Sequence, residues 1–190
     1  MEFPQEILDR FLQVLDREIS LDSFEQWVYA TPELETVLTR DSYLTLLCLD
    51  YRSRHAMHII EQVLRLHVNA GRIETMKLHK HLTIVAQRGE RLPRALVWLY
   101  HRYCWGYKFL DKLAMDYGLD VAVLRDAGSR YSWNNVSQEK LRQLFDLFYP
   151  DIVQEVEKVQ QWLREGMIVI TDVPTEMDSY KWIDRRGKGS

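Results

Sequence analysis

Apolar residues recur every three or four positions along this chain, from its start to about residue 165. The first segment shows the pattern at Ile7, Leu8, Phe11, Leu12 and Leu15. Such spacing places the apolar side chains on one face of a helix. After Gly166 the period changes to two short runs of β type separated by a turn-rich stretch. The pattern therefore predicts an all-α fold of about eight or nine helices, with a small C-terminal β-hairpin at residues 167–185.

Two helix boundaries follow from single residues. A helix is expected from Arg54 to Ala70, with Gly71 as its C-cap. Pro93 should open the longest helix, at residues 93–117, because proline is well tolerated in a first helical turn. Apolar side chains cover most sides of this segment, which makes it the candidate central element of the fold.

The length of 190 residues suits a single hydrophobic core, and 46% of the residues are hydrophobic. We therefore expect one helical domain spanning residues 1–190. Only Gly89 and the loop at residues 127–136 are candidate boundaries, and neither is marked strongly enough to divide the chain.

The chain lacks the features of a membrane or exported protein. No run approaches the roughly 18–20 apolar residues that a bilayer-spanning helix needs. The first residues contain neither a basic region nor an apolar stretch typical of a signal peptide. Cys48 and Cys104 both lie in apolar helical context, so buried free thiols in a reducing compartment are expected. These features predict a cytoplasmic protein without membrane contact.

Charge is segregated along the chain although the total is only −3. Residues 1–51, the acidic block, hold three basic and eleven acidic side chains. Residues 52–112, the basic block, hold twelve basic and four acidic side chains. Such asymmetry indicates either a charged partner or two halves of one fold that attract each other. Both interpretations stay open at the level of sequence.

No motif for catalysis or for cofactor binding competes with this charge pattern. His55 and His58 share a helix face, but the zincin spacing of four with an intervening glutamate is absent. No glycine-rich phosphate loop and no Gly-x-Ser-x-Gly element occurs. Glu33 and Glu35 would point apart on a helix, which suits a solvated surface better than acid–base catalysis. We therefore predict no catalytic residue, no metal site and no cofactor.

One loop mixes cations with aromatic residues. Arg130, Tyr131 and Trp133 are followed by two asparagines, and such a loop could stack a nucleobase. The basic block could add phosphate contacts. Its cations are spread over three expected helices, however, and the whole chain is acidic. A nucleic-acid partner is therefore disfavoured, and Trp133 is expected to fix the loop to the core.

Residues 19–53 contain three recurring elements. They are an Ile-Ser…Phe-Glu-x-Trp-x-Tyr run, an acidic Glu-Leu-Glu turn, and a Tyr-Leu-x-Leu…Tyr-Arg-Ser end. This segment resembles one in small cytoplasmic bacterial immunity proteins, the partners of polymorphic or contact-dependent growth-inhibition toxins. The resemblance covers about 35 of the 190 residues, and the stretch at 85–186 matches no characterised activity.

The resemblance implies a non-enzymatic protein that binds and neutralises a cognate toxin domain. A basic nuclease is the preferred target, and an endoribonuclease is the preferred class. Inhibitors of nucleases present carboxylates where the enzyme expects phosphates, and complementary charge speeds association. Trp27 or Tyr29 would be an aromatic anchor inside the acidic rim. The predicted partner-binding residues are Asp22, Glu25, Trp27, Glu33, Glu35, Asp41 and Asp50.

Two other functions remain open. A helical regulatory or scaffold protein would bind a cellular protein through the same kind of surface. An RNA- or DNA-binding protein would use the basic block and would bind more weakly as salt increases.

Overall fold

A computed structural model describes residues 3–127, 137–177 and 179–187 of the chain, and it divides them into two compact units. Unit 1 is Met1–Asn69 and unit 2 is Ala70–Ser190. The change from one unit to the other lies at residues 69–70, at neither Gly89 nor the 127–136 loop. The expectation of one domain stays a prediction. Trp133 and its loop neighbours lie outside the described residues.

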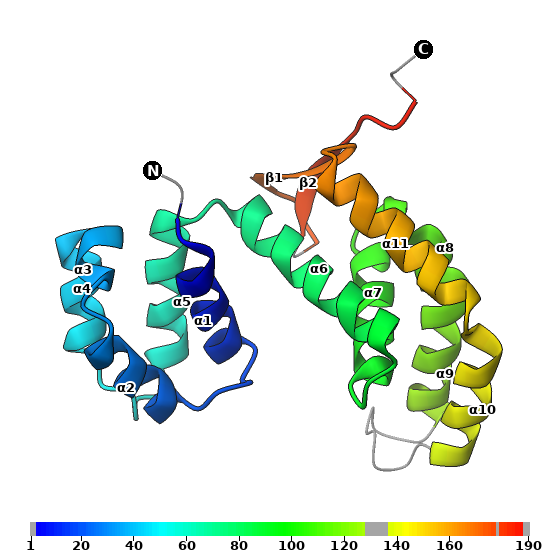
Figure 1. Cartoon of the computed structure of the whole chain (residues 1–190), viewed down its shortest axis with the longest axis horizontal. Coiled ribbons are helices and arrows are strands. Elements are labelled where there is room, and N and C mark those ends of the chain that lie inside the picture. Colours follow the sequence, from blue (N-terminus) through cyan, green and yellow to red (C-terminus); the bar gives the residue numbers. More distant parts are fainter. Residues whose placement is uncertain (1–2, 128–136, 178, 188–190) are drawn as a thin grey trace. The chain divides into compact units, whose positions relative to one another are not determined.

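Unit 1 is entirely helical where it is described (Figure 1). Its elements are α1 Gln5–Leu15, α2 Leu21–Ala30, α3 Leu34–Val37, α4 Arg40–Leu47 and α5 Ala56–His67. Ser20 begins α2 as its N-cap, because its Oγ accepts a hydrogen bond from the Ser23 amide at 3.1 Å. Thr39 caps α4 in the same way, accepting from the Ser42 amide at 3.3 Å.

The core of unit 1 is apolar and aromatic. Leu8, Phe11 and Phe24 are fully buried. The Phe11 and Phe24 rings meet edge to face at 5.2 Å, a geometry that adds to the stabilisation from burial. Polar links at the edge of this core come from hydroxyl and imidazole groups. His67 Nε2 lies 2.9 Å from Ser42 Oγ, which joins α5 to α4.

Unit 2 packs helices against the C-terminal hairpin. Its helices are α6 Ala70–Gln87, α7 Leu92–Cys104, the 3₁₀-helix η1 Lys108–Leu110, α8 Asp111–Leu113, the π-helix η2 Ala114–Gly118, α9 Leu119–Ala127, α10 Gln138–Phe148 and α11 Asp151–Arg164. The core is made where α6, α7 and α11 meet, and Leu82, Leu96 and Val156 are fully buried there.

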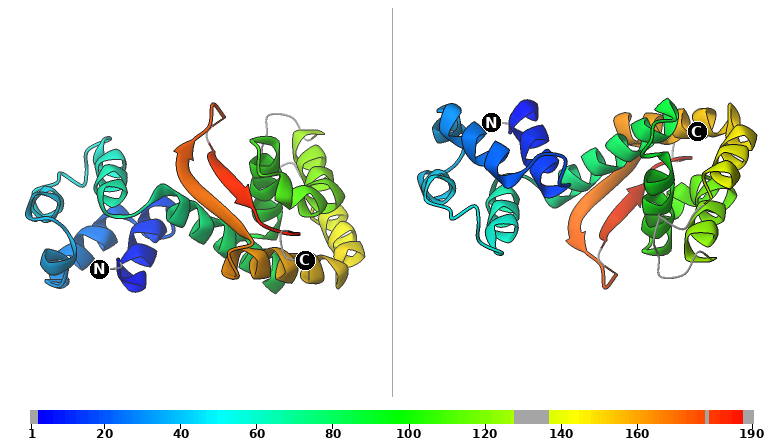
Figure 2. Two further views of the ribbon diagram at one scale, coloured as in Figure 1. Left: turned by 90° about the horizontal axis from the view of Figure 1, so that it is seen from above. Right: turned by 90° about the horizontal axis from the view of Figure 1, so that it is seen from below.

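The hairpin consists of β1 Ile168–Pro174 and β2 Tyr180–Asp184, paired antiparallel (Figure 2). Ile168 lies opposite Asp184 and Ile170 lies opposite Trp182. Ile168 and Ile170 are buried in the core of unit 2, so one face of the sheet is apolar as the alternating pattern requires. The predicted fold class, mainly α with a small C-terminal hairpin, is confirmed.

Gly71 does not cap a helix as the sequence predicted. The preceding helix already ends at His67, and Gly71 lies buried in the first turn of α6. A Cβ at this position would stand 2.2 Å from the Ile170 carbonyl oxygen. Glycine is therefore required here because the backbone of β1 lies directly against α6.

The expected long helix at 93–117 is wrong, because α7 ends at Cys104. Gly106 adopts a φ of +121°, which an α-helix does not allow. The carbonyl groups of Trp105 and Gly106 accept hydrogen bonds from Ser179 and Trp182, near or in β2. Tertiary contacts with the hairpin thus override the helical pattern. The longest described helix is α6, with 18 residues.

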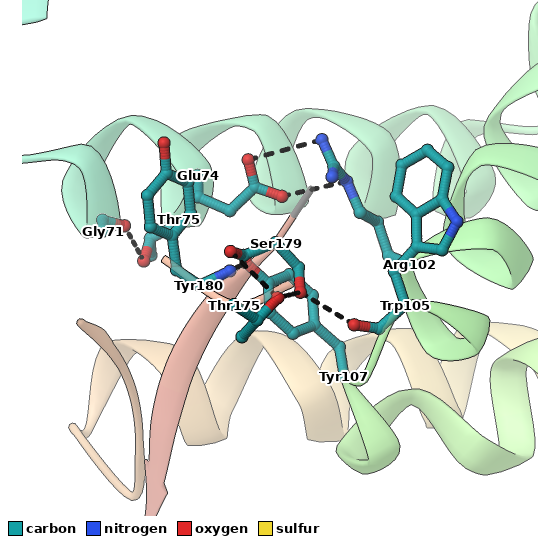
Figure 3. Close-up of polar contacts among 9 residues, drawn as sticks. All are labelled: Gly71, Glu74, Thr75, Arg102, Trp105, Tyr107, Thr175, Ser179 and Tyr180. Atoms are coloured by element: carbon teal, nitrogen blue, oxygen red, sulfur yellow. Dashed lines mark hydrogen bonds and ion pairs between the residues drawn. The ribbon is translucent and has the colours of Figure 1, made fainter. Parts of the chain in front are cut away.

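A buried ion pair joins α6 to α7 in unit 2 (Figure 3). Glu74 is 4% exposed, and its Oε1 lies 2.9 Å from Arg102 Nε. The Arg102 guanidinium also lies over the Trp98 and Trp105 rings, at 4.7 and 5.1 Å from their centroids. Both charges are thus compensated inside the fold, which is what keeps a buried ion pair from being destabilising.

Hydrogen bonds fasten the hairpin beside this ion pair (Figure 3). The Ser179 hydroxyl donates to the Trp105 carbonyl at 2.7 Å. The Tyr180 amide donates to the Tyr107 hydroxyl at 3.3 Å. Burial, reinforced by the charge of Glu74, raises the pKa of Tyr107, so its phenol stays neutral and accepts this bond.

Two further expectations concern solvent. Both cysteines are exposed, so the expected burial of their thiols is wrong. Each lies at a helix end, Cys48 as the C-cap of α4 and Cys104 as the last residue of α7, and periodicity does not report burial at such positions.

Among the helices that the structure describes, none combines the length and the apolar character needed to cross a membrane.

Candidate partner-binding surface

One face of α2 carries two of the predicted carboxylates and an exposed aromatic ring. Asp22, Glu25 and Tyr29 follow one another at spacings of three and four residues, so they share a helix face. The Tyr29 hydroxyl donates to Glu25 Oε1 at 3.3 Å, and the Tyr29 side chain remains 56% exposed. Asp22 lies in the first turn, where the helix dipole favours a negative charge.

Tyr29 also connects this face to α4. Its hydroxyl lies 3.3 Å from the carbonyl oxygen of Leu47, at the end of α4. Cys48, next to Leu47, is close enough to influence the pKa of Tyr29. Asp41 and Leu44 precede Cys48 by seven and four residues, so they extend the same side of α4. Leu44 is 45% exposed.

We call this set the α2–α4 surface, and it combines carboxylates with exposed apolar groups. It consists of Asp22, Glu25, Tyr29, Asp41 and Leu44. Partial desolvation and the hydrogen bond to Glu25 raise the pKa of Tyr29 above its ordinary 10.0. Its phenol is therefore uncharged, and its single O–H proton lies within reach of both Glu25 Oε1 and the Leu47 carbonyl oxygen, which suits a pre-positioned aromatic contact.

The remaining predicted residues lie elsewhere in unit 1. Glu33 and Glu35 are exposed at the start of the four-residue helix α3. Asp50 follows α4, and its Oδ1 accepts from the Arg52 amide at 3.1 Å, as in a local turn. Trp27 is half-buried, with its ring 5.2 Å from Phe24 and 6.1 Å from Phe11. Its packing contributes to the core, whereas Tyr29 is the exposed aromatic residue.

The predicted partner-binding residues of unit 1 include six carboxylates. All six of these carboxylates form no ion pair within the described part of the chain, and they are Asp22, Glu25, Glu33, Glu35, Asp41 and Asp50. The basic block behaves differently, because Arg88, Arg102 and Lys112 pair with carboxylates of unit 2. Part of its charge is thus neutralised inside that unit.

Sequence reasoning missed Leu44 as a surface residue. Leu44 begins the apolar run Leu44–Leu49, and it is not among the predicted partner-binding residues. Leu46 is fully buried, but Leu44 points to solvent. The only signal in the sequence is its spacing from Asp41, an exposed charge three residues earlier on the same helix.

No group of three or more potential ligands, from His, Cys, Asp or Glu, comes together among residues 3–127, 137–177 and 179–187.

No protein-family model matches the chain, and neither the comparison with curated proteins nor that with solved structures finds a match.

Proposed function

We propose that the chain is an immunity protein, a non-enzymatic protein that binds and neutralises a basic toxin domain in the bacterial cytoplasm. A nuclease, in particular an endoribonuclease, is the preferred toxin class. The observation that carries the proposal is the α2–α4 surface, where the exposed ring of Tyr29 shares its helix face with Asp22 and Glu25, and where no ion pair engages these carboxylates among the described residues. The resemblance of residues 19–53 to immunity proteins supports the same function.

The physical logic is electrostatic capture followed by an aromatic contact. Carboxylates on one face imitate the phosphates that a nuclease expects, and their field steers the basic partner toward the surface. Tyr29 and Leu44 supply apolar area inside this rim, and a buried tyrosine is a frequent hot spot of protein interfaces. Unit 1 contains six basic and twelve acidic residues, which gives this field its sign.

The basic block gives only weak support to the alternative of a nucleic-acid-binding protein. Arg102 is enclosed by Glu74 and two tryptophan rings, and Lys112 is held by Glu155 at 2.7 Å. These cations are engaged within unit 2 and are less available for phosphates. The alternative of a regulatory or scaffold protein uses the same surface and differs only in the identity of the partner.

The proposal is tested by capture from the host bacterium followed by an activity assay. Tagged full-length protein should retain a basic protein through a moderate salt wash, and that protein should have a nuclease activity that the chain inhibits at a 1:1 ratio. Capture of a cellular enzyme or regulator whose activity is unaffected would contradict the immunity function and favour the scaffold alternative. Capture of RNA or DNA that nuclease treatment removes would favour the alternative of a nucleic-acid-binding protein.

A further inference from the structure

A pocket of about 260 Å³ opens on unit 2. Its lining residues lie between positions 108 and 186, so none of them belongs to the α2–α4 surface. Residues of η1 and α8, one side of α11 and the segment after β2 line the pocket. Its apolar lining includes Phe109, Leu113 and Val159, which are all buried. The charged lining consists of four cations and two carboxylates, which are Lys108, Lys112, Lys158, Arg186, Asp111 and Glu155.

The carboxylate of Glu155 lies close to the ammonium groups of Lys112 and Lys158. Glu155 Oε1 lies 2.7 Å from Lys112 Nζ, and its Oε2 lies 3.7 Å from Lys158 Nζ. The Glu155 side chain is only 13% exposed, whereas the two lysine side chains are 55% and 52% exposed. The carboxylate therefore lies beneath two solvent-facing cations and leaves this group with a net positive charge.

Trp162 positions the third cation. The Arg186 guanidinium lies 4.3 Å from the centroid of the Trp162 ring, and Lys158 Nζ lies 5.3 Å from it. Asp184 also holds the guanidinium, at 2.7 Å. Three cations from different segments are thus fixed at one opening before any ligand arrives, which lowers the entropic cost of binding.

We propose that this pocket binds a small phosphate monoester whose apolar or aromatic body lies on the Phe109–Val159 side. The lining residues carry a net charge of +2, of which Asp184 neutralises one at Arg186, and a phosphate monoester carries about −1.5 to −2 near pH 7. Its three terminal oxygens accept several N–H donors at once, as the lysines and Arg186 offer. A carboxylate has one charge and two oxygens, and it matches this arrangement less well.

The size of the pocket restricts the ligand. Sites for drug-sized molecules usually measure roughly 300–1,000 Å³. At about 260 Å³ the pocket suits one ring with one phosphate and is too small to enclose a dinucleotide. The inference does not depend on the immunity function, because it uses other residues in the other unit.

The test is calorimetric titration of the full chain with phenyl phosphate, inorganic phosphate and benzoate at constant ionic strength. We expect saturable binding of phenyl phosphate, weaker binding of inorganic phosphate, and no saturable binding of benzoate. Equal affinity for benzoate would overturn the assignment of phosphate. Equal affinity for inorganic phosphate would overturn the role of the apolar lining.

Two sets of substitutions should change this affinity in opposite directions. Lys112→Met with Lys158→Met removes two charge-assisted contacts and should weaken phenyl phosphate binding by about tenfold or more. Glu155→Gln keeps the shape but removes the competing carboxylate, so it should strengthen binding several-fold. Lys140→Met with Lys181→Met is the matched control, because both lysines are exposed outside the pocket.

A purely structural role of these residues predicts a different result. Loss of fold would lower affinity in both sets of variants, whereas only a binding site predicts tighter binding after Glu155→Gln. Circular dichroism of each variant verifies the fold. Absence of saturable phenyl phosphate binding to the unmodified chain, or an affinity that neither set changes, would overturn the site.

Discussion

The two units use their charged residues in opposite ways. In unit 2 the pair Glu74–Arg102 is buried between α6 and α7, and the pair Lys112–Glu155 links α8 to α11. In unit 1 the polar contacts of the interior come from neutral groups, such as the Tyr51 hydroxyl that donates to the Leu46 carbonyl at 2.9 Å. None of the described carboxylates of unit 1 is buried. Ion pairs thus link separate helices in unit 2, whereas the pair Glu61–Arg65 of unit 1 lies within one helix. Under the proposed function, the exposed carboxylates of α2 and α4 are the charges that meet the partner.

The largest effect that separates the units is expected at Glu74. Glu74→Ala leaves the Arg102 charge uncompensated in a buried site, which should lower the free energy of unfolding by about 3–5 kcal/mol. Glu33→Ala, the matched change in unit 1, removes an exposed carboxylate and should cost less than about 0.5 kcal/mol. Urea unfolding followed by circular dichroism measures both. Equal effects would show that the contrast between the units is false.

Glycine usage gives a second difference, because all eight glycines lie in residues 70–190. Gly71→Ala places a Cβ against the Ile170 carbonyl and should destabilise the chain toward the upper end of about 1–3 kcal/mol. At Gly89 a Cβ meets nothing within 4 Å. Gly89→Ala should therefore change stability by no more than roughly 0.5 kcal/mol. Thermal unfolding compares the two variants, and a tolerated Gly71→Ala would contradict the close approach of α6 and β1.

Within unit 1, Trp27 and Tyr29 of α2 should separate stability from binding. Tyr29→Ala should weaken partner binding by roughly 2 kcal/mol while leaving the fold intact, because the ring is 56% exposed. Trp27→Ala should instead lower the free energy of unfolding by roughly 2 kcal/mol through lost packing on Phe11 and Phe24. Affinity and unfolding measurements on both variants are needed. The reverse assignment would move the binding surface to Trp27.

The smallest expected effect is a dependence of the stability of unit 1 on pH. Burial lowers the pKa of His67 below its ordinary 6.5. Below pH 6.5 the unfolded chain therefore binds a proton that the folded chain does not, and stability should fall until the pH passes the pKa of the folded state. His67→Gln should reduce this loss, whereas His58→Gln, an exposed control on α5, should not. Urea midpoints between pH 7.5 and 5.5 provide the comparison.

The sequence predicts most of the helices, because their apolar stripes and caps are local. Ser20 as a cap, the start of α11 after Pro150 and the hairpin at 168–184 follow from residues near one another in the chain. The errors at Gly71 and at the end of α7 have a common cause. Both positions are determined by β1 and β2, roughly 75 to 100 residues later in the chain, and a local pattern carries no information about such contacts.

The candidate surface was predicted only in part. Composition identifies the acidic block, and spacing places Asp22 and Glu25 on one face, but neither shows which charges are paired internally. From the sequence, Trp27 or Tyr29 was the candidate aromatic anchor, and only Trp27 was among the predicted partner-binding residues, because periodicity does not separate an interface aromatic residue from a core one. The structure separates the two residues through their exposure. It also adds Leu44 to the candidate surface, although leucine is a residue type usually found in the core.

The measurement that tests the central contrast most directly is the association rate with the captured partner at low and moderate salt. The triple variant Asp22→Lys, Glu25→Lys, Asp41→Lys is compared with Glu157→Lys, Glu165→Lys, Glu176→Lys, which changes the net charge equally but lies on exposed positions of unit 2. We predict that the unit 1 variant slows association at least tenfold and loses its salt dependence, while the unit 2 variant has a much smaller effect. Equal slowing by both variants would mean that net charge alone matters. It would contradict the account in which unit 1 presents its carboxylates to the partner.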